Sequence, residues 1–327
     1  MKILNEIYED KIFDYKIFDF YFKNAKIGIF DIETTGLSPK KNNLILSGFV
    51  IPLEDGTLLV KQLFAESLDD EAQVIEETIN ILNSLDCIIT YNGASFDLPF
   101  LQKRMTHLNV KNNYVPYNLD LYRVMKKYSP VSKFMPNLKQ TTLENFMGLW
   151  NKRTDKIDGG KSIDLYAQYL LSKDIQLERQ ILLHNSDDVK QLYRLLDVLK
   201  KCDLHRAMCA FGFPCGRENE FIIDKIKLST KKLTITGNKI GKPFFYEMYD
   251  DESQCSAKFE GHKFEVQILL INEDILTFID LINFKMDLNY FKNCEGLYNH
   301  YLVLATDKEP DPQSVSTFIK KLFERIT

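Results

Sequence analysis

Five side chains in three short segments carry the chemistry that this sequence suggests first. They are Asp31 and Glu33 in FDIETTGL, Asp97 in YNGASFD, and His184 and Asp188 in HNSDDV. Asp31 and Glu33 follow an apolar run two residues apart, and side chains at i and i+2 of a strand point to the same face. Two carboxylates at such a short distance repel each other, and a nearby divalent cation is the group that best keeps both of them ionised. The other interpretation is a solvent-facing edge strand with two ordinary surface acids.

The remaining acids lie where they could join this pair. Asp97 follows a short apolar strand and the Asn92-Gly93 turn, near the start of a predicted helix with Ser95 as its cap. His184 and Asp188 are four residues apart on a second predicted helix and so share one face. Carboxylates and an imidazole that converge in this way are typical of a site for two Mg²⁺ or Mn²⁺ ions about 4 Å apart, which stabilises an in-line phosphoryl displacement. Taken singly, Asp97 is also explained by the helix dipole and Asp188 as an exposed helix acid.

The elements that must position these side chains alternate along the first part of the chain. Apolar patterns predict strands at 27–33, 43–53, 58–66, 87–93 and 117–121, and helices at 71–85, 95–108, 141–150, 162–172 and 176–201. The strands at 43–53 and 58–66 flank Glu54-Asp55-Gly56, a favourable hairpin turn. This order predicts an α/β fold, a mixed sheet flanked by helices with catalytic groups at strand ends and on a helix packed across them.

The character of the chain changes near residue 205. Beyond it the segments are strand-like, several with period-2 alternation, until Asp311 and Pro312 form a cap and first-turn pair before a final helix. We therefore predict two domains: a catalytic α/β domain over 1–204, and a smaller, antiparallel β-rich (α+β) accessory domain over 205–327.

The composition is that of a globular protein, with 45% apolar and 27% charged residues in a chain of 327. No run of about 18 apolar residues is present to span a bilayer. The first residues, MKILNEIYEDK, contain acids where a signal peptide is apolar. The six cysteines form no C-x-x-C pair, which indicates reduced thiols without a disulfide framework or zinc cluster. We expect a cytoplasmic protein with no membrane partner.

Charge is distributed unevenly along the chain. The net charge is −4, but residues 98–161 contain 12 Lys and Arg against 4 Asp and Glu, so the remainder sums to −12. Aromatic residues are interleaved with these cations: Tyr114, Tyr117, Tyr122, Tyr128, Phe134, Phe146 and Trp150, among Lys126, Lys127, Lys133, Lys139, Lys152 and Arg153. Basic and aromatic side chains together suit single-stranded nucleic acid. The alternative is that the aromatic rings are core and the lysines form a solvated face.

The three acidic segments, in this order and spacing, resemble the motifs of the DEDD 3′–5′ exonucleases, which have a ribonuclease H-like fold. YNGASFDLPFL, NLKQTTLENFMGL and TDKIDGGKSIDLY resemble the YprB-like branch of that superfamily. The resemblance covers about residues 26–200. It implies a metal-dependent 3′–5′ exonuclease that hydrolyses phosphodiester bonds at the 3′ end of single-stranded DNA or RNA.

The resemblance also implies roles for individual residues. Asp31, Glu33, Asp97 and Asp188 would be the ligands of two divalent metal ions, Mg²⁺ or Mn²⁺. His184 would be the general base that deprotonates the attacking water, a role suited to a group that titrates near neutrality. His184 precedes Asp188 with three residues between, the spacing of the tyrosine-bearing subgroup, although a histidine at this spacing occurs in the YprB-like branch.

A pocket for the terminal nucleotide is implied as well. Thr34, Gly36 and Leu37 would line it, with Leu37 against a base, although a plain turn also explains Gly36. Asn92 and Phe96 either contact the substrate or only shape their turn. Of the neighbouring acids, Asp187 is expected to be solvated. Asp120 is either structural, which we favour slightly, or a residue that supports the metal ligands.

Two other functions fit parts of the pattern. A catalytically inert, ribonuclease H-like nucleic-acid-binding module would keep the fold, but here all four acids are intact. A phosphohydrolase of the haloacid-dehalogenase type needs a second aspartate where Glu33 stands. The accessory domain has 16 basic and 18 acidic residues over 205–327, so we do not expect it to hold a phosphate backbone over its whole surface. It could bind the incoming strand, a protein partner or another subunit.

Overall fold

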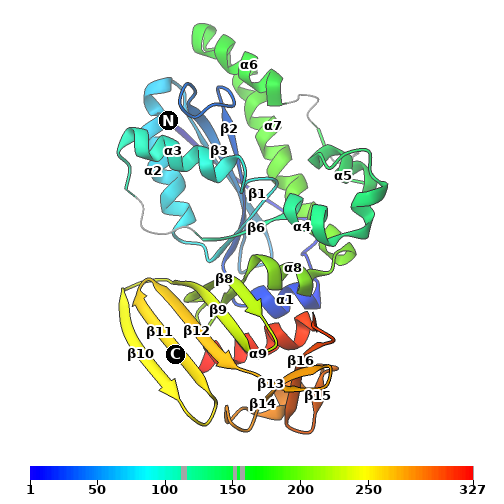
Figure 1. Ribbon diagram of the computed structural model, residues 1–327. Helices are drawn as coiled ribbons and strands as arrows, with labels where there is room; N and C mark the ends of the chain where they lie inside the picture. Colours follow the sequence, from blue (N-terminus) through cyan, green and yellow to red (C-terminus); the bar gives the residue numbers. More distant parts are fainter. Residues whose placement is uncertain (112–115, 150–152, 155–158, 327) are drawn as a thin grey trace. The chain divides into compact units, whose positions relative to one another are not determined.

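The computed structural model describes residues 1–111, 116–149, 153–154 and 159–326, which fold into two compact units (Figure 1). The first unit contains Met1–Tyr15 and Lys26–Cys202, and the second contains Lys16–Ala25 and Asp203–Thr327. The functional division into an exonuclease domain and an accessory domain stays a prediction.

A six-stranded mixed sheet forms the centre of the first unit. Its strands are β1 (Lys2–Tyr8), β2 (Ile27–Thr34), β3 (Leu44–Pro52), β4 (Leu58–Phe64), β5 (Cys87–Thr90) and β6 (Tyr117–Asp120), in the order β1-β4-β3-β2-β5-β6. Strands β2, β5 and β6 are parallel, and the other neighbours are antiparallel. The predicted mixed α/β sheet and its β3–β4 hairpin are confirmed.

Helices flank this sheet. They are α2 (Glu71–Leu82), α3 (Asp97–Leu108), α4 (Leu121–Tyr128), α5 (Gln140–Phe146), α6 (Gly159–Ser172) and α7 (Ile175–Arg194), with 3₁₀ turns at Leu68–Asp70, Pro130–Phe134 and Leu195–Lys201. Helix α7 packs against β2, β3 and β4, and α2 packs against β3 and β4. Strand alternation explains the placement of the acids, because Phe30 and Ile32 enter the hydrophobic core while Asp31 and Glu33 alternate with them.

The second unit has two antiparallel sheets. One has the order β10-β11-β12-β9-β8-β7, formed by β7 (Pro214–Cys215), β8 (Phe221–Leu228), β9 (Lys232–Lys239), β10 (Phe244–Asp250), β11 (Cys255–Gly261) and β12 (Lys263–Leu269). The other has β13 (Ile271–Glu273), β14 (Leu276–Asp280), β15 (Leu297–Tyr298), β16 (Tyr301–Thr306) and β17 (Glu309–Pro310). The predicted antiparallel β-rich fold is confirmed.

Three helices and a 3₁₀ turn complete the second unit: α1 (Lys16–Phe22), α8 (Leu204–Phe211), α9 (Pro312–Ile326) and η5 (Leu288–Phe291). The predicted cap of α9 is confirmed, because the carboxylate of Asp311 accepts from the backbone N–H groups of Gln313 and Ser314. None of the helices in the described ranges has the length and apolar character needed to cross a bilayer.

Candidate active site

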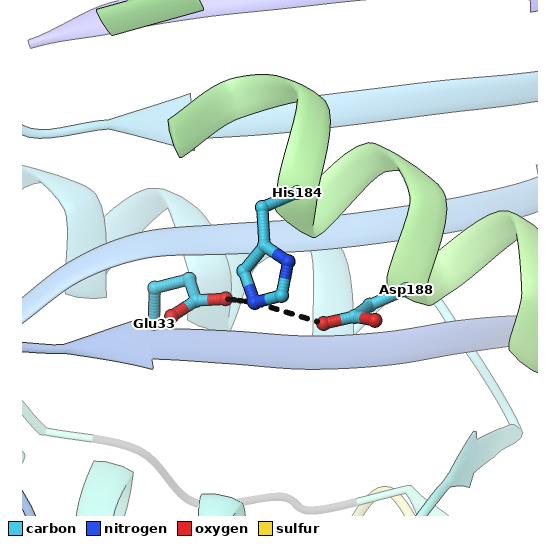
Figure 2. Close-up of side chains that lie close together, drawn as sticks. All are labelled: Glu33, His184 and Asp188. Carbon is cyan, nitrogen blue, oxygen red and sulfur yellow. Dashed lines mark ion pairs between the residues drawn. The ribbon is translucent and has the colours of Figure 1, made fainter. Parts of the chain in front are cut away.

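Glu33, His184 and Asp188 form the tightest group of potential metal ligands (Figure 2). His184 and Asp188 lie one turn apart on α7, and His184 Nε2 is 3.5 Å from Glu33 Oε1 and 3.5 Å from Asp188 Oδ2. The donor atoms of all three residues lie within 4.8 Å of one another. Two carboxylates and one imidazole at these distances form a donor set that can hold a divalent metal ion.

Asp31 and Asp97 face the same cavity but lie outside this group of three. Asp97 is buried at the first residue of α3, and its Oδ1 accepts a hydrogen bond of 3.2 Å from the backbone N–H of Ile32. Ile32 separates Asp31 from Glu33, so this bond fixes Asp97 beside both. The structure thus brings the four acids and His184 to one cavity, from β2, α3 and α7.

Asp120 holds the loop that precedes Asp97 and α3. The Asp120 carboxylate accepts from the backbone N–H groups of Asn92 (2.9 Å) and Ala94 (3.1 Å). Asn92 has φ 63°, a left-handed conformation that asparagine tolerates. The expected structural role of Asp120 fits these bonds. The predicted cap was wrong: α3 begins at Asp97 with Phe96 in the cap position, because the backbone N–H of Ser95 turns back to the carbonyl of Asn92.

The crowded acids hold protons more tightly than ordinary carboxylates. Burial raises the pKa of Asp31 well above its usual value, and the charges of Asp97, Asp188 and Glu33 raise it further. Burial raises the pKa of Glu33 to about 7, although the nearby His184 opposes this change. Burial likewise raises the pKa of Asp97 to about 7. Ionising these buried, neighbouring carboxyl groups is unfavourable in free energy. A bound divalent cation would stabilise their ionised forms, so the arrangement suits a metal site.

Arg153 is a site residue that the sequence suggested only as part of a basic stretch. Its Nη2 lies 2.6 Å from Asp188 Oδ1 and 2.8 Å from Glu144 Oε1, and its Nε donates to Glu144 Oε2 at 3.0 Å. Glu144 is buried on α5, so the pair connects α5 to the predicted metal ligand on α7. No local pattern marks either residue, because 35 positions separate Arg153 from Asp188.

Asp187 differs from its expected solvated position. It is buried, and it accepts hydrogen bonds from the backbone N–H of Thr154 and, at 2.8 Å, from the Thr154 hydroxyl. The prediction was wrong because the turn of α7 that presents Asp188 to the cavity presents Asp187 to Thr154, which follows Arg153 in the chain. Asp187 thus helps to hold Arg153 near Asp188.

Asn185 is a second residue that sequence reasoning missed. Its Nδ2 donates to Asp31 Oδ2 at 3.1 Å, and its Oδ1 accepts from Gln62 Nε2 at 3.0 Å. Asp31, Gly48 and Gln62 lie side by side on β2, β3 and β4. A Cβ atom at Gly48 would come within 2.1 Å of Asn185 Oδ1. Gly48 therefore provides the space in which Asn185 orients Asp31.

The cavity in front of the acids has a volume of about 430 Å³. Four of the five predicted substrate residues line it: Thr34, Leu37, Asn92 and Phe96. Gly36 does not line it and has a structural explanation, because its φ is 153° and a Cβ atom there would come within 2.8 Å of the Asn42 side chain. Leu37 is 81% exposed and is free to contact a ligand. Tyr91, Lys139, Gln140 and Thr141 complete much of the wall.

The basic and aromatic stretch divides between core and surface. Tyr117 is buried, whereas Phe134 and Phe146 are exposed and Lys139 lines the cavity. Tyr114, Trp150, Lys152 and residues 155–158 lie outside the described residues. The alternative that these rings are core is therefore confirmed for Tyr117, and the nucleic-acid-binding interpretation stays a prediction.

Comparison with known proteins gives a match to one family and matches to parts of two larger proteins. The family model RNase_H_2, described as the RNase_H superfamily, matches residues 29–200, just over half of the chain. The curated DNA polymerase III PolC-type of Mycoplasmopsis pulmonis (strain UAB CTIP) is 29% identical over 150 residues, which are 40% of this chain and 10% of that protein. Among solved structures, the family B DNA polymerase from the hyperthermophilic archaeon Pyrobaculum calidifontis has a TM-score of 0.44 and 19% identity, over 54% of this chain and 24% of the other. The YprB-like branch stays a prediction.

Proposed function

The chain belongs to the RNase_H superfamily, and we propose that it is a metal-dependent 3′–5′ exonuclease that acts on single-stranded DNA or RNA. The observation that carries this proposal is the convergence of the four acids and His184 on one cavity. The pattern of raised carboxyl pKa values supports it, because a purely structural site has no reason to gather four acids at such an electrostatic cost.

In this proposal Asp31, Glu33, Asp97 and Asp188 hold two divalent ions, Mg²⁺ or Mn²⁺. Such ions, when bound, supply positive charge to the attacking and leaving oxygens of the phosphodiester. The protein supplies the positions of the ligands. The backbone of β2 holds Asp97 through Ile32, and Asn185 orients Asp31.

His184 is the proposed general base. Its ring is buried and fixed between Glu33 and Asp188, so Nε2 faces the region where the acids converge. The two carboxylates stabilise the imidazolium that forms when Nε2 takes a proton from the attacking water. A histidine is suited to this transfer because its unperturbed pKa lies near neutral pH.

The cavity walls suit the terminal nucleotide of a single strand. The exposed side chain of Leu37 and the ring of Phe96 offer apolar contacts to a base or sugar, and Lys139 and Arg153 offer positive charge to phosphates. A volume of about 430 Å³ is that of a pocket for one small ligand, which agrees with cleavage from an end.

Cleavage of 5′-labelled single-stranded DNA and RNA of matched sequence tests the proposal. The wild type is compared with Asp31→Asn and with Asp69→Asn, an exposed acid outside the cavity, in Mg²⁺, Mn²⁺ or EDTA. We expect a ladder that shortens from the 3′ end with metal, is retained in Asp69→Asn, and falls by roughly a hundredfold or more in Asp31→Asn. No ladder with any metal on either strand, with binding retained, would instead indicate an inert binding module.

A further inference from the structure

The second unit has a cavity of its own, with a volume of about 500 Å³. Of its ten lining residues four are basic and two are acidic. The basic ones are Arg217, Lys285, Lys321 and Arg325. Residues 205–327 as a whole contain more acids than bases, 18 against 16, so an excess of positive charge at one cavity is a local feature.

The two arginines of this cavity are held by neutral partners. Arg217 Nε donates to the backbone carbonyl of Glu324 at 3.1 Å, and Arg325 Nη1 donates to the backbone carbonyl of Phe284. Within the described part of the chain, no carboxylate lies within ion-pair distance of either guanidinium. Each guanidinium has five N–H donors in a planar fork, so both keep donors and charge for an anion.

The two lysines differ from the arginines because each has an acidic partner. Lys285 Nζ lies 3.1 Å from Glu252, and both side chains are largely exposed, so this ion pair contributes little and is easily exchanged. Lys321 Nζ lies 2.6 Å from Glu324 and 3.8 Å from the centre of the Tyr290 ring. Lys321 thus places a cation directly against an aromatic ring.

Tyr290 itself lines the cavity and is 57% exposed. An exposed ring beside several cations offers both contacts that single-stranded nucleic acid makes with proteins, a stacking surface for a base and positive charge for phosphates. A lone phosphate would leave the ring unused, and a cavity of about 500 Å³ is in the size range for a ligand as large as a nucleotide.

We propose that this cavity binds one nucleotide unit of single-stranded nucleic acid, with its phosphate on the arginines and its base on Tyr290. It would be a binding site additional to the cavity of the first unit. The choice of nucleic acid as the ligand rests on the proposed exonuclease function. The physical basis of the site, excess cations beside an exposed aromatic ring, does not.

Binding without cleavage tests this site. Fluorescence anisotropy of 5′-fluorescein-labelled (dT)₂₀ and (U)₂₀ is measured in EDTA with the full chain. The cavity variant is Arg217→Gln with Lys285→Gln, two exposed residues. The matched control is Lys225→Gln with Lys227→Gln, two exposed lysines on β8 outside the cavity. Both double variants lose two positive charges, so only position differs.

We expect the cavity variant to bind roughly tenfold more weakly than the control. The slope of log K against log salt should also be smaller by about 0.7, the contribution of one phosphate contact to a single strand. Tyr290→Ala should also weaken binding about tenfold, whereas Tyr290→Phe should retain it because the stacking surface remains.

Equal affinities and salt slopes for the cavity and control variants would overturn the site, whatever the cleavage assay gives. Weaker binding by the cavity variant supports the site even if no 3′ ladder is found, and the failure would then concern catalysis alone. If Tyr290→Phe binds as weakly as Tyr290→Ala, base stacking is excluded and the proposal fails in that part.

Discussion

At the scale of single residues, the carboxyl groups of Glu33 and Asp97 predict how the metal-free protein responds to pH. Both have a pKa of about 7 in the folded protein, against ordinary values of 4.5 and 3.8. A raised carboxyl pKa stabilises the folded state at low pH, and that contribution is lost as pH rises from the unfolded to the folded pKa. In EDTA the free energy of unfolding should therefore fall between about pH 4 and pH 7. Each group should contribute to this loss over the pH interval between its unfolded and its folded pKa.

Urea denaturation in EDTA at pH 5.5 and pH 8 measures this loss. Glu33→Gln should lose less stability than the wild type over the same interval, because it removes one of the titrating groups. Mn²⁺ should raise the wild-type stability at pH 8 more than that of Glu33→Gln. Equal pH dependence of the two proteins would contradict the interpretation.

The contact between Arg153 and Asp188 gives a second prediction at this scale. The guanidinium lies 2.6 Å from a carboxylate oxygen that we propose as a metal ligand, and its charge repels a cation. Arg153→Gln should therefore tighten Mn²⁺ binding several-fold, measured by titration calorimetry. Lys103→Gln, an exposed lysine that does not line the cavity, is the control for loss of one charge. Unchanged or weaker Mn²⁺ binding in Arg153→Gln would show that the arginine does not compete with the metal.

How far the sequence predicts the site depends on the distance over which each residue acts. Asp31, Glu33, Asp97, His184 and Asp188 stand in short motifs whose local geometry can be inferred from strand and helix periods. Arg153, Glu144 and Asn185 act through contacts between segments far apart in the chain, and no periodic pattern marks them. The burial of Asp187 escapes prediction for the same reason, since its partner Thr154 lies 33 residues away.

At the scale of elements, β3 supports the site through one missing side chain. A Cβ atom at Gly48 would overlap Asn185 Oδ1, so Gly48→Ala should displace Asn185 from both Asp31 and Gln62. We expect a loss of stability of about 1–3 kcal/mol from overpacking. We also expect weaker Mn²⁺ binding, by about 10–100-fold, because the orientation of a metal ligand is lost.

A double-mutant cycle separates these two effects. In Asn185→Ala with Gly48→Ala the clash is gone, so urea denaturation should show stability partly restored relative to Gly48→Ala alone. Mn²⁺ binding should stay weak, because Asp31 still lacks its partner. Restored metal binding in the double variant would mean that Asn185 is only a packing residue.

The elements themselves were largely predictable, because each has a local period. The β3–β4 hairpin follows from alternation around a favourable turn, and α2 and α7 from helical spacing of apolar residues. The start of α3, with Phe96 and not Ser95 in the cap position, was not predictable, because the loop after β5 is held by Asp120, 28 residues from Asn92. Strand β1 was also missed, since its pairing with β4 joins segments far apart in the sequence.

At the scale of the whole molecule, the path of the chain determines how much of the division into two units can be predicted from the sequence. The change in composition near residue 205 coincides with the start of the main segment of the second unit, Asp203–Thr327. The shorter segment, Lys16–Ala25, precedes all of Lys26–Cys202 and has no compositional signal. This segment belongs to the second unit because α1 packs against α8 and β7. These contacts are long-range in the sequence, and no local pattern predicts them.

This arrangement predicts that α1 stabilises the second unit and not the first. Tyr21 on α1 is buried, and its hydroxyl lies 2.8 Å from His205 Nδ1 and donates to Ser316 Oγ at 2.9 Å. Tyr21→Ala should cost about 3–5 kcal/mol through the cavity left by the ring. Tyr21→Phe should cost about 1–3 kcal/mol, because it removes only the hydroxyl, whose polar partners are the buried Ser316 and the half-buried His205. Hydrogen exchange followed by mass spectrometry shows which unit loses stability. Peptides from 203–327 should lose protection in the order wild type, Tyr21→Phe, Tyr21→Ala, while peptides from 26–202 keep theirs, since the two units have separate cores. Equal loss of protection in both sets of peptides would show that the units unfold together, and the chain would then behave as one cooperative body despite its two cores.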